Sequence, residues 1–255
     1  MKKRTWKNNV ITVAAALAVI VAVWAVAYAV VGNDLLLPSF TDCVLAAFAL
    51  LSTSAFWTAF FGTLLRVVIA FLSSFIFALI FAVIAYMLPT FRAFFAIIVG
   101  AIRSLPVLAV LLIILVWTSA GIAPTVVAFL SLFPMLYTGI SAALLRVDYK
   151  LIEMSRTYRV PLKKQIFGLY LPSALPAVCM ECGAAFSFGL KAVVSAEVLA
   201  RSANSLGNMA SDMQINTAIP QLFAMIIVVC LTGILVESIG VWLGHLAQRG
   251  MDNAN

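Results

Sequence analysis

The sequence predicts an all-α, polytopic membrane protein with about six transmembrane helices and with both termini in the cytoplasm. Hydrophobic residues make up 65% of the 255 positions and charged residues 10%, whereas soluble domains average roughly 45–50% and about 25%. Such a chain has too little polar surface to cover a globule, so the excess must face lipid and a water-soluble enzyme is excluded. The apolar runs are long enough to cross a bilayer, and the basic residues gather in the loops of one side.

The first predicted span covers residues 9–32. It follows a basic start, and Ala27-Tyr28-Ala29 resembles the cleavage site of a secretory signal peptide. The apolar region of a signal peptide has only about 7–15 residues, however, and this run is longer. We therefore expect a retained transmembrane helix.

A shorter apolar segment, residues 43–51, has about half the length that a membrane helix needs. Thr and Asp side chains accept hydrogen bonds from the free backbone N–H groups at a helix start, so Thr41 or Asp42 can cap this segment. We expect a short helix that lies at the outer interface of the membrane.

The remaining spans, two to six, occupy residues 61–245 of what we expect to be a single transmembrane domain, 1–255. Arg103 and Pro106 interrupt the third span, and residues 201–218 are expected to form the last outer loop. The five apolar runs lie at about 61–87, 94–117, 125–145, 174–199 and 220–243.

Basic loop residues set the orientation of the spans. The N-terminal segment holds four, the turn at 88–93 one, the polar segment at 146–170 six and the C-terminal tail one, together twelve of the sixteen Lys and Arg residues. Six spans with cytoplasmic termini place all twelve on the same side. The net charge of +7 is therefore a topology signal and does not indicate a nucleic-acid partner.

Residues 147–171 form the one long cytoplasmic loop. Asp148 is a candidate N-cap for a short helix, Val160 and Pro161 end that helix, and Pro161 suits the first turn of a second one. Apolar residues lie among the charges of the first helix, which is typical of a helix that docks into a groove on another protein. An ordinary basic loop that only sets topology is the alternative.

The loop contains three spaced motifs: Glu153-Met154-Ser155, position 159, and Leu169-Tyr170-Leu171-Pro172. Their spacing resembles the cytoplasmic signature of the permease subunits of ATP-binding-cassette importers. That signature is Glu-Ala-Ala, three residues, Gly, nine residues, then Ile-x-Leu-Pro. Matches such as Leu37-Pro38-Ser39 and Ser205-Leu206-Gly207 extend the resemblance over about residues 35–245. They are similar to the nitrate, sulfonate and taurine branch, which includes pyrimidine-precursor transporters.

Two departures from the family pattern stand out. Arg159 occupies the glycine position, so the bend needs either a left-handed arginine, at a cost of about 1 kcal/mol, or a different turn that Pro161 supplies. The Gly-Arg pair that the family carries early in the fifth span is replaced by Glu181-Cys182-Gly183.

The resemblance implies a type I importer permease in the bacterial cytoplasmic (inner) membrane. Two permease copies, as a homodimer in the simplest case, form the path, an external binding protein delivers the solute, and each copy docks one cytoplasmic ATPase. The chain lacks the Gly-x-x-x-x-Gly-Lys-Ser/Thr phosphate loop, so we expect no cofactor on it and assign ATP and Mg²⁺ to the partner. The implied docking residues are Leu151, Glu153, Met154, Ser155, Arg156, Thr157, Tyr158, Arg159, Leu171 and Pro172.

Charged residues inside spans are costly and need partners or water. Candidates for the translocation path are Arg66, Arg103 with the nearby Pro106, Lys191 and Glu197. Arg103 and Lys191 suit an anionic solute, although two positions do not settle the chemistry. Small residues around Gly183 are candidates for close contact between two permeases.

Three other classes of function remain open, and one is a purely structural membrane subunit in which the loop serves assembly alone. A stand-alone secondary carrier or channel needs its own intramembrane ion sites, and no acidic cluster is evident in the sequence. An intramembrane enzyme needs a convergent catalytic set, and the one histidine, His245, lies outside the spans. We expect neither catalytic nor metal-binding residues, and Cys179 and Cys182 fit packing better than a metal or redox site.

Overall fold

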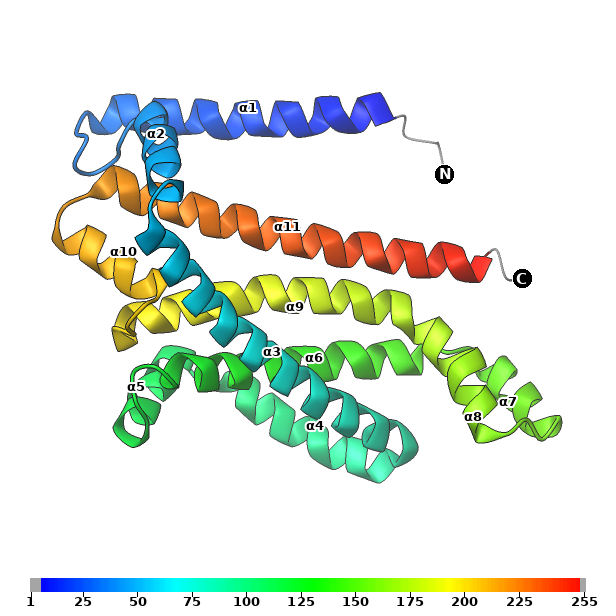
Figure 1. The fold of residues 1–255 in the computed structure, drawn as a ribbon. Helices are drawn as coiled ribbons and strands as arrows, with labels where there is room; N and C mark the ends of the chain where they lie inside the picture. The colour runs from blue at the N-terminus through cyan, green and yellow to red at the C-terminus, as the bar shows by residue number, and fades with distance from the viewer. Residues whose placement is uncertain (1–5, 253–255) are drawn as a thin grey trace. The chain divides into compact units, whose positions relative to one another are not determined.

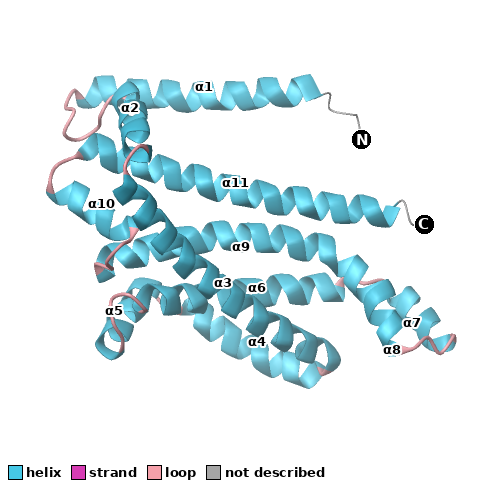
Figure 2. Cartoon of the chain, viewed as in Figure 1, coloured by secondary structure: helices cyan, strands magenta, loops and turns pink. Residues whose placement is uncertain are grey.

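The computed structural model describes residues 6–252, and every regular element in this range is helical (Figures 1 and 2). The chain divides into two compact units, which are described one at a time. The first unit holds residues up to Trp57 together with Ala210–Val228. It contains α1 (Trp6–Val31), α2 (Phe40–Leu51), the first turn of α3 (Ser54–Met87), the end of α10 (Leu206–Ile215) and the start of α11 (Ile219–Asp252).

Trp24 of α1 joins the parts of the first unit. Its indole N–H donates to the carbonyl of Pro38 at 3.1 Å, and its ring lies edge-on against Phe223 at a centroid distance of 5.4 Å and against Phe40 at 6.4 Å. A tryptophan can combine a large apolar contact with one hydrogen bond, which suits it to this position. One side chain thereby ties α1 to α2 and to the start of α11.

The short helix predicted at 43–51 is confirmed as α2, but its predicted cap is wrong. Ser39, rather than Thr41 or Asp42, is the N-cap, and its hydroxyl oxygen accepts from the backbone N–H of Asp42 at 3.1 Å. The reason is that Phe40 already belongs to the helix, which moves Asp42 into the first turn. A carboxylate there is stabilised by the helix dipole.

The second unit contains the rest of α3, the start of α10 and α11 from residue 229. Between them lie α4 (Pro89–Ser104), α5 (Val107–Trp117), α6 (Ala123–Leu145), α7 (Tyr149–Thr157), α8 (Leu162–Gln165), the π-helix η1 (Ile166–Tyr170) and α9 (Leu171–Ala200).

Four helical stretches within the described residues are long and apolar enough to cross a membrane. They are Ser54–Met87, Ala123–Leu145, Lys163–Ala200 and Ile219–Gly250, which correspond to predicted spans two, four, five and six. The bent pair α4 and α5 adds a fifth if it counts as one span, while the apolar stretch of α1, Ala18–Val31, is shorter. Span one therefore stays a prediction.

The third predicted span, 94–117, is not a straight helix. Its helices α4 and α5 meet at 89°, and Leu105 between them is extended, with φ −67° and ψ 130°. Pro106 explains the break, because proline has no N–H for the helix ladder and disfavours helical geometry in the residue before it. The predicted loop at 201–218 is also corrected, since it contains α10.

The core of the second unit lies along α6 and α9, which run side by side (Figure 1). Much of α6 is buried along its whole length, including Leu132, Leu136 and Ile140. At one end, the side chains of Leu111, Ile114, Ala123, Val127 and Ala196 form a closed apolar cluster between α5, α6 and α9. Two helices thus organise the other elements of this unit.

Glycines bring α9 and α11 into direct backbone contact. A Cβ built on Gly183 would lie 2.8 Å from the Cα of Gly240 and 3.1 Å from the carbonyl oxygen of Glu237. Small residues allow such close packing between membrane helices. We predicted that the small residues around Gly183 contact a second permease. At Gly183 they instead contact α11 of the same chain.

Substitution of Gly240 tests this contact. We expect Gly240→Val to destabilise the protein by about 1–3 kcal/mol, because the added atoms overlap the backbone of α9. The measurement is thermal unfolding of the purified chain in mild detergent. Gly100→Ala is the matched control, since a Cβ at Gly100 meets nothing within 4 Å. Equal melting temperatures for both variants would contradict the packing.

Candidate functional site

The helix α7 of the loop at 147–171 begins where the sequence predicts. Oδ1 of Asp148 accepts from the backbone N–H of Lys150 at 2.9 Å, and its backbone carbonyl accepts from Ile152 at 3.2 Å. Asp148 is therefore the N-cap, as expected.

The helix α7 has one packed face and one exposed face. Ile152 and Ser155 are buried, and the Ser155 hydroxyl is satisfied because it donates to the carbonyl of Ile152 at 2.7 Å. Leu151, Met154 and Tyr158 are exposed at 42%, 53% and 77%. Large apolar side chains on a short helix among charges form a surface that fits a groove on a partner. We call Leu151, Met154 and Tyr158 the α7 exposed face.

The other predicted docking residues surround this face in part. Glu153, Thr157 and Arg159 are exposed, as is Leu171 at the start of α9, while Pro172 is half-buried. The side chain of Arg156 lies outside the described part of the structure. Ser155 belongs to the packed side of α7.

Arg159 takes the left-handed conformation, with φ +51°. The backbone N–H of Val160 donates to the carbonyl of Ser155 at 2.9 Å, so α7 ends in the turn that normally has glycine at this position. Of the two alternatives for this bend, the structure adopts the left-handed arginine. The left-handed turn therefore forms here without a glycine.

The chain after the bend passes into α9 without a loop. The side-chain amide of Gln165 donates to the carbonyl of Val160 at 2.7 Å, and the backbone N–H of Gln165 donates to the carbonyl of Pro161 at 3.0 Å. From there helical geometry is continuous over Lys163–Ala200 (Figure 1). A stiff connection of this kind can transmit a rigid-body displacement.

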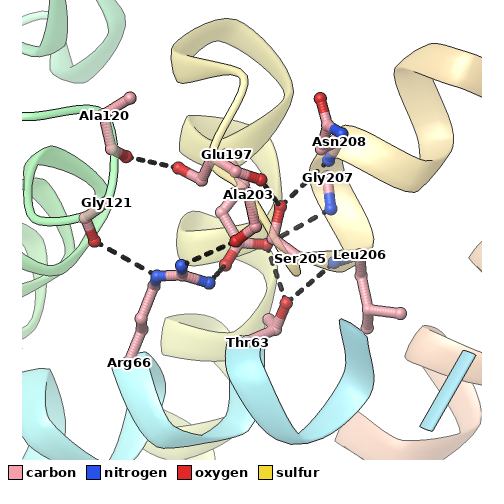
Figure 3. Close-up of polar contacts among 11 residues, drawn as sticks. Thr63, Arg66, Ala120, Gly121, Glu197, Ala203, Ser205, Leu206, Gly207 and Asn208 are labelled. Carbon is pink, nitrogen blue, oxygen red and sulfur yellow. Dashed lines mark hydrogen bonds and ion pairs between the residues drawn. The ribbon is translucent and has the colours of Figure 1, made fainter. Parts of the chain in front are cut away.

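A buried polar cluster lies at the opposite end of α9. The carboxylate of Glu197 is fully buried and pairs with Arg66 of α3, with 2.9 Å between Nη1 and Oε1. The Thr63 hydroxyl donates to its other oxygen at 2.8 Å, and the backbone N–H of Gly207 does so at 3.2 Å (Figure 3). Both carboxylate oxygens therefore have partners.

Arg66 and Thr63 extend this cluster to two connecting segments, one between α5 and α6 and one between α9 and α10. The guanidinium of Arg66 also donates to the carbonyl of Gly121, between α5 and α6, at 3.2 Å and to that of Ala203 at 3.1 Å. The Thr63 hydroxyl accepts from the backbone N–H of Leu206 at 2.9 Å. The Ser202 hydroxyl donates to the carbonyl of Ala120 (Figure 3). We call these residues, together with Glu197 and Gly207, the Glu197 cluster.

A left-handed turn at Arg201 connects α9 to the segment that contributes to this cluster. Arg201 has φ +53° and ends α9, with the backbone N–H of Ser202 donating to the carbonyl of Glu197 at 3.4 Å. A Cβ on Gly207 would overlap the Glu197 side chain, and one on Gly62 would overlap the carbonyl of Asn204. Only glycine fits at these two positions, because any side chain would overlap the neighbouring atoms.

The pairing of Arg66 with Glu197 was not anticipated from the sequence. The ion pair of Glu197 is made 131 positions away in the sequence, beyond the reach of helical spacing. Two intramembrane charges of opposite sign were the available signal, because such charges need partners. Their contacts support a structural role, and path lining by these two residues stays a prediction.

Arg103 lies apart from that cluster and lines a pocket of about 300 Å³. Leu105 and Val107, on either side of Pro106, also border it. Lys191 is exposed on α9 and lies near Gly233 of α11. The remaining lining residues are Ile102, Val110, Val127, Leu130, Ser131, Pro134, Met135, Thr138 and Phe188.

Removal of the Glu197 carboxylate tests the buried pair. We expect Glu197→Ala to destabilise the protein by about 3–5 kcal/mol, because it leaves the charge of Arg66 without its counterion and the Thr63 hydroxyl and Gly207 N–H without their acceptor. Thermal unfolding in detergent measures this. Lys191→Ala, which removes an exposed charge from the same helix, is the control and should change stability little. A mild effect of Glu197→Ala, equal to that of the control, would contradict the structural role.

Substitution of Arg159 tests the strained turn. Arg159→Gly should stabilise the protein by about 1 kcal/mol, because glycine adopts the left-handed region freely. Lys150→Gly, within α7, should have the opposite sign, because glycine in a helix costs about 1 kcal/mol. Unfolding temperatures of the two variants decide the matter, and a loss of stability in both would refute the left-handed turn.

Comparisons with known proteins agree with this architecture. Residues 74–251 match the family described as the binding-protein-dependent transport system inner membrane component. No curated protein matches the chain in sequence.

Two solved structures share the fold. A chain of the MetNI methionine ABC transporter, in an inward-facing conformation, is 18% identical with a TM-score of 0.59, over 75% of this chain and 93% of that one. A chain of an amino acid ABC transporter solved with histidines is 18% identical with a TM-score of 0.57, over 73% and 89%. At this identity the likeness concerns the fold alone.

The family match covers more than two thirds of the chain and includes the helices on both sides of the turn at Arg159. The fold likeness and the membrane-length helices agree with it. The chain belongs to the binding-protein-dependent transport system inner membrane component family and is a permease subunit of an ABC importer.

Proposed function

We propose that this permease forms the translocation path for a small solute that an external binding protein delivers. Two copies, as a homodimer, enclose the path, and each docks one cytoplasmic ATPase that binds ATP and Mg²⁺. The loop at 147–171 couples ATPase closure to movement of the spans. The resemblance of the loop and of the neighbouring motifs to the nitrate, sulfonate and taurine branch favours an anionic solute.

The α7 exposed face is the single observation that carries this proposal. Leu151, Met154 and Tyr158 present apolar surface on a helix whose other side is anchored by Ile152 and Ser155. An apolar helix face fits a groove on a partner protein. Because helical geometry continues from Lys163 to Ala200, displacement of the docked turn would move a whole span.

The test is recovery of the ATPase with the permease. The double variant Leu151→Ala with Met154→Ala removes much of the α7 exposed face, and each buried methylene group contributes about 0.8 kcal/mol. We expect at least about tenfold less ATPase in a mild-detergent pull-down of the tagged permease from its native cell, quantified by mass spectrometry.

Ile97→Ala is the matched control for this experiment. Ile97 is also an exposed aliphatic residue, but it lies on α4, within the apolar helices. ATPase recovery with this variant should equal that of the unchanged permease. Undiminished recovery with the double variant would refute docking at α7. Recovery of the folded wild-type permease without an ATPase in this pull-down would instead favour a stand-alone carrier or channel.

A further inference from the structure

We propose that the pocket beside Arg103 binds a small organic anion, through its carboxylate or sulfonate group, about halfway across the membrane. This inference rests on the proposed function, since such a site has a use only in a chain through which solutes pass. It assigns to the path a definite binding position and one residue that recognises charge.

The depth of the pocket follows from the helices that line it. Pro134, one of the lining residues, is eleven residues from either end of α6, which puts about 16 Å of helix on each side of it. Phe188 lies near the middle of α9. The hydrocarbon core of a bilayer is about 30 Å thick. The pocket is therefore near the centre of the span.

The charge of Arg103 is not compensated by a neighbouring carboxylate. Among the side chains that the structure describes, no carboxylate lies within ion-pair distance of Arg103. Its place in the last turn of α4 is favourable because helix C-termini attract cations, but partial charges do not neutralise a full one. An arginine at this depth is costly unless water or an anion pairs with it.

Among the residues that line the pocket, Arg103 is the one whose side chain has N–H donors. The hydroxyl of Ser131 donates to Val127 of its own helix at 3.0 Å, and that of Thr138 donates to Pro134 at 2.9 Å. Both hydroxyls thus offer only lone pairs to a ligand. Among these side chains only the guanidinium can donate N–H groups to an anion, and its planar donors match the oxygens of carboxylates and sulfonates.

The size of the pocket and the side chains that line it indicate what the uncharged part of the ligand is like. A volume of about 300 Å³ equals the share of roughly ten water molecules at about 30 Å³ each. This corresponds to a solute of about ten non-hydrogen atoms. The remaining walls are largely apolar, with Met135, Leu130 and Phe188 among them. One charged head on an apolar body fits this arrangement.

Thiol reactivity tests the inference without knowledge of the natural solute. The four native cysteines are replaced in the full-length permease, and Ser131→Cys, a nearly isosteric change, places one thiol in the pocket. Its rate of modification is measured with three reagents of similar size. These are sulfonatoethyl, carboxyethyl and trimethylammonioethyl methanethiosulfonate, which carry two different anionic heads and a cationic one.

The informative quantity is the ratio of the anionic rate to the cationic rate. Arg103 also makes the thiol more reactive, but that effect is the same for every reagent and cancels in the ratio. We expect the ratio to fall about tenfold in Arg103→Gln, because the attraction for the anionic heads is lost. Arg103→Lys should keep it, since a cation remains. Comparison of the sulfonate and carboxylate reagents tells which head the pocket prefers.

Two results would overturn the inference. One is a ratio that Arg103→Gln leaves unchanged at Ser131→Cys and also at Thr138→Cys, a second position in the pocket. The other is a thiol that reacts with no reagent in the folded protein but reacts after denaturation, which would show that the pocket is closed to solutes.

The outcome is separable from that of the docking experiment. Modification of the thiol needs neither the ATPase nor transport, so an anionic-to-cationic ratio that Arg103→Gln leaves unchanged, in a permease that still retains its ATPase, refutes only the anion site. A permease that shows the preference but recovers no ATPase refutes docking and keeps the pocket.

Discussion

The fully buried carboxylate of Glu197 is the constraint on which the connecting segments of the second unit depend. A charge in an apolar protein needs both a counterion and hydrogen bonds, because desolvation is otherwise far too costly. Arg66 supplies the first, and Thr63 and the backbone of Gly207 supply the second. Since Arg66 also bonds to the backbone between α5 and α6 and between α9 and α10, and Thr63 bonds to the start of α10, one ion pair organises two connecting segments.

The long helix α9 relates the three regions described above. Its beginning continues from the turn at Arg159, its middle contributes Phe188 to the pocket, and its end carries Glu197. Packing against α6 and direct backbone contact with α11 at Gly183 leave it little freedom to bend on its own. Displacement of such a helix is expected to be that of a rigid body, and closely packed interfaces tend to move between discrete arrangements.

Arg159 adopts a backbone conformation that glycine usually occupies. Glycine is common after a helix because it enters the left-handed region without strain. Here two hydrogen bonds stabilise the turn, one from the Val160 N–H to the Ser155 carbonyl and one from the Gln165 side chain to the Val160 carbonyl. Arg159 therefore adopts the left-handed conformation despite its strain. The surrounding contacts, more than the residue itself, determine this bend.

Composition and apolar run length sufficed to predict a helical membrane protein, and the Glu153 to Pro172 spacing sufficed to predict the family, because hydrophobicity and local motifs are properties of contiguous sequence. Four spans, the Asp148 cap and the helix–bend–helix loop were predictable for the same reason. Tertiary structure alone decided that Glu197 pairs with Arg66, that Gly183 meets Gly240, and that Arg103 faces a pocket between α4, α6 and α9. These contacts join positions that are distant in sequence, and which of several intramembrane charges meet depends on helix rotation and packing, which no local pattern encodes.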